Sequence, residues 1–348
     1  MTINPNNIRE KLAKNILADG FEPIIDLDKS HGSYIVDHRD GSEYLDMFSM
    51  YATGAVGYNH PYILNHKDIL GNLAINKTTL SDVYNVYYSD FLETFNTIAI
   101  PKYLTNAFFI DGGTLAVENA LKAAFDWKRR KNIDKNLTTK GDKIIYFNQA
   151  FHGRSGYTLT LTNTSDPRKT MYFPKFPWFK VDNPKVSFPL DNDVLSSVIS
   201  EELKTIADIK NIIIQNPDDI AAIIIEPIQG EGGDNHFRNE FMVQLEEICK
   251  ESEILLIFDE VQTGIGITGK MWAHEHFTVK PDIISFGKKT QVCGMLAGDR
   301  IKEVENNVFT ESSRINSTFG GNLVDMFRFK LILEIIQSEK LLNNATDM

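Results

Sequence analysis

Short, nearly continuous apolar runs alternate with amphipathic segments along most of this chain. Residues 144–147, 221–225 and 254–258 are apolar without alternation, which is typical of strands buried on both faces of a parallel sheet. Between the last two runs, residues 239–252 carry apolar side chains at helical spacing. This strand–helix–strand order predicts an α/β fold, with a mostly parallel central sheet and helices on both of its faces.

The two ends of the chain have patterns of their own. Near the N-terminus, residues 34–36 and 44–45 flank Asp40-Gly41, a dipeptide typical of a tight hairpin turn. Near the C-terminus, residues 322–342 are predicted to form one long helix with a broad apolar face. Because no downstream segment is available for that face, we expect a partner subunit, or a C-terminal domain that this sequence lacks, to cover it.

Composition narrows the classes of function. The sequence has 36 basic and 47 acidic residues, a formal net charge of −11, and no basic stripe, which argues against a nucleic-acid partner. No apolar run approaches the ~18 residues of a membrane span. The N-terminal segment lacks the apolar core of a secretory signal, and Cys249 and Cys293 are too few for a disulfide framework. We therefore expect a cytoplasmic protein.

Two segments have the composition of anion sites. Gly112 and Gly113 precede a predicted helix that runs to about residue 130, and free backbone N–H groups at a helix N-terminus bind phosphate. A glycine turn followed by Thr114 as an ordinary cap is the simpler interpretation of this segment alone. Residues 316–322 offer backbone donors and hydroxyl groups, including that of Thr318, which also suit a phosphate.

Other candidate side chains follow two of the predicted strands. Phe151 is suited to stacking on a planar ligand, and Arg154 to binding a carboxylate with both guanidinium nitrogens. Glu231 lies in a glycine-rich loop after residues 221–225, where ligands of open α/β sheets bind. A structural loop and a solvated loop are the simpler interpretations of these two segments alone.

A carboxylate and a lysine lie next to apolar runs. Asp259 closes a predicted strand and needs a partner there, such as a protonated pyridine nitrogen, whose ring Gln262 could also reach. Lys288 follows residues 283–286, where desolvation lowers the pKa of its amine and makes the amine a nucleophile toward aldehydes. In an extended segment, Lys288 and Lys289 point to opposite sides, so only one faces a site. Alone, the pair is more simply interpreted as surface lysines.

Taken in order, these motifs have a specific resemblance. Phe-His-Gly-Arg, Glu-Pro-Ile-Gln-Gly-Glu-Gly-Gly, Asp-Glu-Val-Gln-Thr-Gly, Gly-Lys and Ser-Thr-Phe-Gly-Gly-Asn resemble the class III (ω-) aminotransferases of fold type I. The resemblance implies pyridoxal 5′-phosphate as the cofactor and a homodimer that shares its active sites. Lys288 and Asp259 are then the catalytic residues. Further contacts to the cofactor are implied for Gly112, Gly113, Phe151 and Gln262, and for Thr318 from the other subunit.

The segment after Lys288 resembles one subgroup of this family in particular. Residues 289–294 and 314–318 resemble the subgroup that transfers the ε-amino group of L-lysine to 2-oxoglutarate. This implies Arg154, Glu231 and Asn316 as substrate-binding residues, with Glu231 paired to an arginine of the C-terminal domain. The resemblance also divides the chain: residues 1–48 belong to a small domain, 49–325 form the large cofactor-binding domain, and 326–348 begin the helix toward the absent C-terminal domain.

Several alternatives remain open at this point. Another class III pyridoxal enzyme with a different ω-amino donor, or a truncated relative without activity, would keep the same motifs. Residues 264–269 spell the dinucleotide-binding pattern Gly-x-Gly-x-x-Gly, although five residues separate it from the preceding apolar run. No metal site is expected, because His274 and His276 are two residues apart and do not share a helix face.

Overall fold

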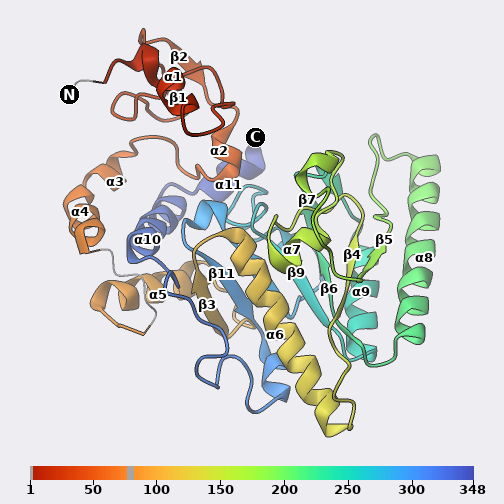
Figure 1. Cartoon of the computed structure of the whole chain (residues 1–348). Coiled ribbons are helices and arrows are strands. Elements are labelled where there is room, and N and C mark those ends of the chain that lie inside the picture. Colours follow the sequence, from red (N-terminus) through yellow and green to blue (C-terminus); the bar gives the residue numbers. More distant parts are fainter. Residues whose placement is uncertain (1–2, 77–81) are drawn as a thin grey trace.

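The computed structural model describes residues 3–76 and 82–348. Its centre is a seven-stranded sheet of order β3-β11-β10-β9-β6-β4-β5 (Figure 1). The strands are β3 (Asn106–Ile110), β4 (Lys143–Phe147), β5 (Phe179–Val181), β6 (Ile220–Ile225), β9 (Leu255–Asp259), β10 (Ile283–Phe286) and β11 (Cys293–Ala297). Only β11 runs antiparallel to its two neighbours, β10 and β3. The predicted α/β class with a mostly parallel sheet is confirmed.

Helices cover both faces of this sheet (Figure 1). On one face, α6 (Gly113–Asp134) packs its alanine-rich side on Ile144, Ile224 and Ile257. On the other face, α5 (Val86–Ile98), α9 (Asn239–Glu251) and α10 (Leu323–Ser338) join the cluster that contains Ile145, Ile223 and Leu256. Consecutive strand residues thus enter opposite layers, which explains why the strand sequences are apolar without alternation.

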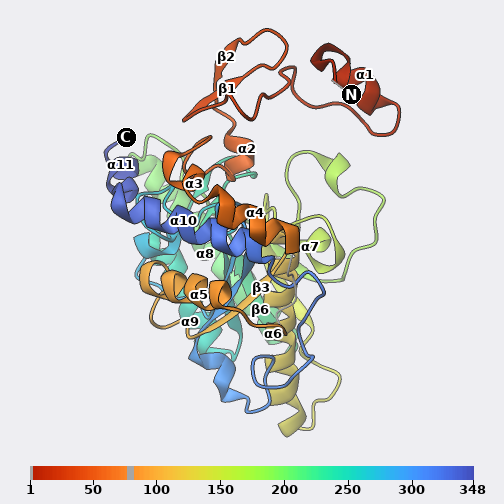
Figure 2. The same cartoon turned by 90° about the vertical axis from the view of Figure 1, so that its left-hand side faces the viewer.

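The remaining elements are short or peripheral. The predicted hairpin is present: β1 (Tyr34–Val36) pairs antiparallel with β2 (Glu43–Leu45), and Gly41 has a φ of 78° in the turn. Figures 1 and 2 show it at the end of the molecule where the C-terminus lies. The other helices and strands are α1 (Ile8–Ala13), α2 (Ser49–Ala52), α3 (Pro61–Leu64), α4 (Lys67–Asn76), α7 (Gly156–Leu161), α8 (Asn192–Gln215), β7 (Ile228–Gln229), β8 (Asn235–His236) and α11 (Leu341–Asp347). The 3₁₀ turns are η1 (Pro5–Asn7), η2 (Pro167–Lys169), η3 (Ala273–His276), η4 (Lys288–Thr290) and η5 (Asp299–Glu303).

The C-terminal helical region differs from its prediction. Instead of one helix over residues 322–342, α10 ends at Ser338, and Lys340, with a φ of 54°, is the N-cap of α11. The expectation that only a partner subunit or a downstream domain could cover the apolar face was wrong. Helix α5 from upstream covers it: the ring centroids of Phe95 and Phe329 are 5.2 Å apart, and Phe329 is fully buried. The sequence pattern shows that a face is apolar, but it does not show which distant segment packs on it.

No helix within the described ranges, 3–76 and 82–348, is long and apolar enough to cross a membrane.

Candidate active site

The candidate site lies where the carboxyl ends of the central strands meet. Asp259 is the last residue of β9, and Ser285 lies opposite it on the neighbouring parallel strand β10. Lys288 follows β10 after Gly287, at the start of η4. The parallel pairing of β9 and β10 therefore brings Asp259 and Lys288 to the same edge of the sheet.

Asp259 is buried, and three donors hold its carboxylate. Ser285 Oγ and the Val261 backbone N–H donate to Oδ1 over 3.0 and 3.1 Å, and His152 Nδ1 donates to Oδ2 over 2.8 Å. Burial opposes protonation of His152, but the Asp259 carboxylate outweighs it and raises the pKa of the imidazole. Neither His152 nor Ser285 is among the side chains that the sequence pattern predicts for the site. Their adjacency to Asp259 depends on strand pairing and loop path, although His152 was part of a recognised motif.

Lys288 is half-buried beside this carboxylate. Its Nζ donates to Gln262 Oε1 over 2.6 Å. Burial lowers the pKa of the amine, whereas the charges of Asp259, Glu226 and Glu231 act in the opposite direction. An amine with a lowered pKa is a better nucleophile toward an aldehyde at neutral pH.

The prediction that this segment is extended was wrong. Lys288 has a φ of 54° and opens the 3₁₀ turn η4. The amine of the next residue, Lys289, donates to the backbone carbonyl of Gln262 over 2.5 Å. Both lysine amines therefore reach Gln262, one at its side chain and one at its backbone.

The helix that begins beside Lys288 has an open N-terminus. Gly112 has a φ of 98° and lies at the N-cap of α6, where no side chain caps the first turn. The alternative in which Thr114 acts as an ordinary cap is therefore wrong. A Cβ atom on Gly113 would lie 2.8 Å from Cγ1 of Val261, so glycine permits this close approach to the loop after β9. The amides of the first turn remain available to an anion.

The segment predicted to offer hydroxyls lies beside this helix end. The carbonyl of Phe319 accepts a hydrogen bond from the Asp111 backbone N–H over 3.1 Å. Thr318 is exposed, and the side-chain amide of Asn316 lies 3.3 Å from a carboxylate oxygen of Asp82. The structure thus places this segment next to the glycine pair and leaves the Thr318 hydroxyl at the surface.

Phe151 connects the centre of the site to its rim. Its backbone N–H donates over 2.9 Å to Oε1 of Glu226, which is buried after β6. Burial raises the pKa of Glu226 to about 8; the Asp259 carboxylate acts in the same direction, and the charge of His152 acts against it. In the sequence, Glu226 is only the first residue of a loop motif, because its burial depends on the tertiary fold.

Two cations flank the ring of Phe151. Arg154 Cζ and Lys169 Nζ each lie 5.8 Å from the ring centroid. Arg154 is exposed, whereas the half-buried Lys169 forms a salt bridge with Glu231. Lys169 lies outside the recognised motifs, and periodicity could not have identified it. Together these residues form a rim that can bind carboxylates around an aromatic surface.

The dinucleotide-binding alternative fails on structure. The glycine-rich residues 264–269 form turns, and only the four-residue η3 lies between them and β10, so no helix N-terminus faces a pyrophosphate there. Within the described part of the chain, no group of three or more His, Cys, Asp or Glu side chains is arranged to hold a metal ion.

Comparison with known proteins gives consistent matches. The family model described as "Aminotransferase class-III" matches residues 17–348. The chain is 48% identical to an L-lysine-epsilon aminotransferase of Mycobacterium tuberculosis, over 98% of this chain and 76% of that protein. It is 43% identical to the protein of the same name from Amycolatopsis lactamdurans, over 97% of this chain and 76% of that protein. The solved lysine aminotransferase of M. tuberculosis in the internal aldimine form superposes with a TM-score of 0.94 at 47% identity, covering 98% of this chain and 78% of that one.

Proposed function

Because the chain belongs to the class III aminotransferases, which use pyridoxal phosphate, we propose that it transfers the ε-amino group of L-lysine to 2-oxoglutarate. The products would be 2-aminoadipate 6-semialdehyde and glutamate. The observation that carries the proposal is a difference in sequence identity between two groups of named relatives. Relatives named L-lysine-epsilon aminotransferase are 42 to 48% identical over at least 96% of the chain, whereas a relative named 4-aminobutyrate aminotransferase is 35% identical over 84%.

The residues of the site fit pyridoxal phosphate. The uncapped first turn of α6, with Gly112 and Gly113, suits a phosphate. The buried Asp259 carboxylate suits a protonated ring nitrogen, and the Phe151 ring suits a stacking contact. We assign Gln262 to the ring oxygen and Thr318, from a second copy of the chain, to the phosphate. When bound, the cofactor supplies an electron sink for the carbon that carries the substrate amine.

The chain's own residues then perform the proton chemistry. Lys288 Nζ, held by Gln262 Oε1 beside the Asp259 carboxylate, is the amine that would hold the cofactor through its aldehyde group. With its lowered pKa, the same amine would act as the general base and acid that moves the proton at the substrate carbon. Asp259, held by His152 and Ser285, remains in place to stabilise the proton on the ring nitrogen.

Substrate recognition falls to the rim around Phe151. We assign Arg154 to a substrate carboxylate and Glu231 to the part of the substrate farther from the reacting carbon. Asn316, which lies outside this rim beside Asp82, is also assigned to the substrate. Glu231 is paired with Lys169 in this structure, so a charged substrate that binds at the rim would rearrange this ion pair. Removing either partner leaves the other charge unbalanced beside the ring.

The decisive experiment is an absorption titration of the purified chain. Pyridoxal phosphate is added first, and L-lysine without a keto acid follows. Conversion of the bound aldehyde form to the amine form supports lysine as the donor. If 4-aminobutyrate, but not lysine, produces the conversion, the chain is a class III enzyme with a different donor. If no cofactor binds to a folded chain, the proposed function is wrong for this polypeptide.

A further inference from the structure

We infer that Lys289 is a positioning residue, which holds the backbone of Gln262 so that its amide faces the amine of Lys288. This inference rests on the proposed function only where it concerns the cofactor. The contacts that carry it belong to the chain itself. They lie in the loop after β9, residues 259–264, and in the turn after β10.

Two neighbouring lysines fix one glutamine from two sides. Lys289 Nζ donates to the carbonyl oxygen of Gln262 over 2.5 Å, and Lys288 Nζ donates to Oε1 of the same residue over 2.6 Å. The glutamine is confined on a third side, because a Cβ atom on Gly230 would lie 2.5 Å from its Nε2. The orientation of the Gln262 amide therefore depends on where the loop backbone is held.

The rest of the loop is anchored by other groups. The Glu260 carboxylate accepts hydrogen bonds from Thr263 Oγ1 over 2.5 Å and from the backbone N–H groups of Ala273 and His274 over 3.0 and 2.8 Å. Asp259 is held by its own three donors. The bond from Lys289 anchors the part of the loop between these carboxylates and Gly264.

Burial of the Lys289 ammonium costs free energy, because a charge is removed from water, and it requires compensating contacts. Lys289 is 4% exposed, and within the described ranges no carboxylate lies at salt-bridge distance from it. Burial, with the charge of Lys288 acting in the same direction, lowers the pKa of Lys289 to about 8, and Glu260 acts against this. The hydrogen bond to the Gln262 carbonyl compensates part of the cost, which is consistent with a positioning role.

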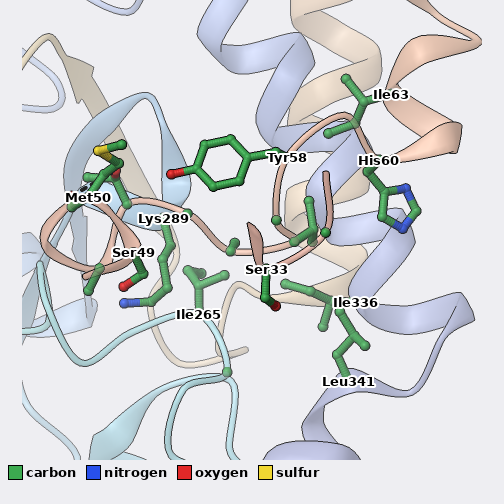
Figure 3. A pocket seen from close by; sticks show the side chains of 18 of the residues that line it. Ser33, Ser49, Met50, Tyr58, His60, Ile63, Ile265, Lys289, Ile336 and Leu341 are labelled. Carbon is green, nitrogen blue, oxygen red and sulfur yellow. Dashed lines mark hydrogen bonds between the residues drawn. The ribbon is translucent and has the colours of Figure 1, made fainter. Parts of the chain in front are cut away.

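Lys289 also lies between the candidate active site and a neighbouring pocket. It lines a pocket of about 760 Å³ whose walls include the N-terminal segment, α10 and α11, and Lys288 is not among the lining residues. Figure 3 shows Lys289 on the same side of this pocket as Ser49 and Ile265, with Ile336 and Leu341 on the opposite side. Removal of its amine therefore changes the support of the loop without removing the Lys288 amine.

The test begins with the cofactor-free chain and the variant Lys289→Met, which keeps a long side chain and removes the donor. Hydrogen exchange is measured on a peptide that spans residues 259–264. We expect exchange in this peptide to be roughly tenfold faster, the effect of losing one buried hydrogen bond. The matched control is Lys302→Met, a surface lysine paired with Asp299, and it should leave the peptide unchanged. Unchanged exchange in a folded Lys289→Met variant overturns the inference, whether or not the chain binds cofactor.

A double-mutant cycle then tests the route through Gln262. The dissociation constant of pyridoxal phosphate, measured by fluorescence quenching, should rise roughly tenfold in Lys289→Met. In a Gln262→Ala background the same substitution should add little, because the side chain that Lys289 positions is gone. An equal loss in both backgrounds would show that Lys289 acts independently of Gln262. If the methionine variant does not fold, Lys289→Leu, which also lacks a donor, takes its place with the same expected outcomes.

Discussion

At the scale of single residues, the charges of three buried side chains, Asp259, His152 and Glu226, depend on one another. Asp259 accepts hydrogen bonds from three donors, and His152 is favoured in its charged form by that carboxylate. Glu226 is buried in the same cluster, and its pKa is raised to about 8. At neutral pH its carboxyl group is therefore mostly protonated, and the cluster does not carry a second uncompensated negative charge.

The two adjacent lysines should respond differently to truncation. Lys288→Ala removes the only amine assigned to the cofactor aldehyde, so turnover should fall by at least ~10³-fold. Lys289→Ala should retain turnover at saturating pyridoxal phosphate, because it acts on loop position. Steady-state rates and the absorption spectrum of each loaded variant check this, and the reverse pattern would overturn the assignment of Lys288.

The raised pKa of Glu226 predicts a dependence of stability on pH. The folded state keeps a proton on Glu226 that the unfolded chain loses above its ordinary pKa of 4.5. The stability contributed by this proton is therefore present below about pH 4.5 and is lost as the pH rises toward about 8. Glu226→Gln should remove this part of the decline.

Thermal unfolding of the cofactor-free chain, followed from about pH 5 to about pH 9, measures this effect of pH on stability. The difference in melting temperature between Glu226→Gln and the parent chain should grow in favour of glutamine as the pH rises. Glu247→Gln, on an exposed part of α9, should run parallel to the parent chain. Parallel curves for Glu226→Gln as well would contradict the assigned protonation state.

At the scale of elements, every recognised motif except Ser-Thr-Phe-Gly-Gly-Asn follows or ends a strand of the central sheet. Gly112 follows β3, Phe151 follows β4, Glu226 follows β6, Asp259 ends β9 and Lys288 follows β10. These strands share a direction, so their carboxyl ends form one edge. This is why the apolar runs were sufficient to predict the α/β class, and why the residues after them meet at one edge. The roles assigned to those residues came from the family resemblance and stay predictions.

The elements also show where prediction from sequence stops. The antiparallel strand β11 was not predicted, because a buried strand has the same apolar pattern in either direction. The break between α10 and α11 was missed because Lys340, a lysine with a φ of 54°, carries no glycine or proline signal. His152, Glu226 and Lys169 depend on contacts between distant loops, which periodicity does not encode.

The start of α6 provides a prediction at this scale. Gly113→Ala would place a Cβ atom 2.8 Å from Cγ1 of Val261 and push the helix N-terminus away from the loop after β9. We expect a loss of ~1–3 kcal/mol in the free energy of unfolding, together with weaker phosphate binding. Gly71→Ala is the matched control, since Gly71 lies in α4 with nothing within 4 Å of its Cβ position.

Urea unfolding and binding of pyridoxal phosphate measure the two effects. The control should be neutral or more stable by about 0.5–1 kcal/mol, because alanine is the better helix former. Adding Val261→Ala to Gly113→Ala should recover part of the phosphate affinity by relieving the contact. If Gly113→Ala binds pyridoxal phosphate as tightly as the parent chain, this helix end does not hold the phosphate.

At the scale of the whole molecule, the cofactor site is assembled from the sheet edge and surface loops. The centre, with Asp259 and Lys288, is buried or half-buried within one chain. Thr318 is exposed beside the glycine pair of α6, which is consistent with a hydroxyl that serves a second copy. If a homodimer shares its sites, Thr318 of one chain should affect cofactor binding at the site of the other chain. If each chain holds a complete site, it should not.

Hybrid dimers test this sharing. One chain carries Lys288→Ala with its own Thr318, and the other carries Thr318→Ala with its own Lys288. If Thr318 binds phosphate across the interface, the site with Lys288 receives an intact Thr318 from the first chain and has parental affinity for pyridoxal phosphate. The Thr318→Ala homodimer should bind it roughly tenfold more weakly, the effect of one lost hydrogen bond to a charged group. If Thr318 instead serves the site of its own chain, the hybrid binds as weakly as the Thr318→Ala homodimer. Mixing the two tagged chains, isolating the doubly tagged species and titrating it with cofactor distinguishes these results.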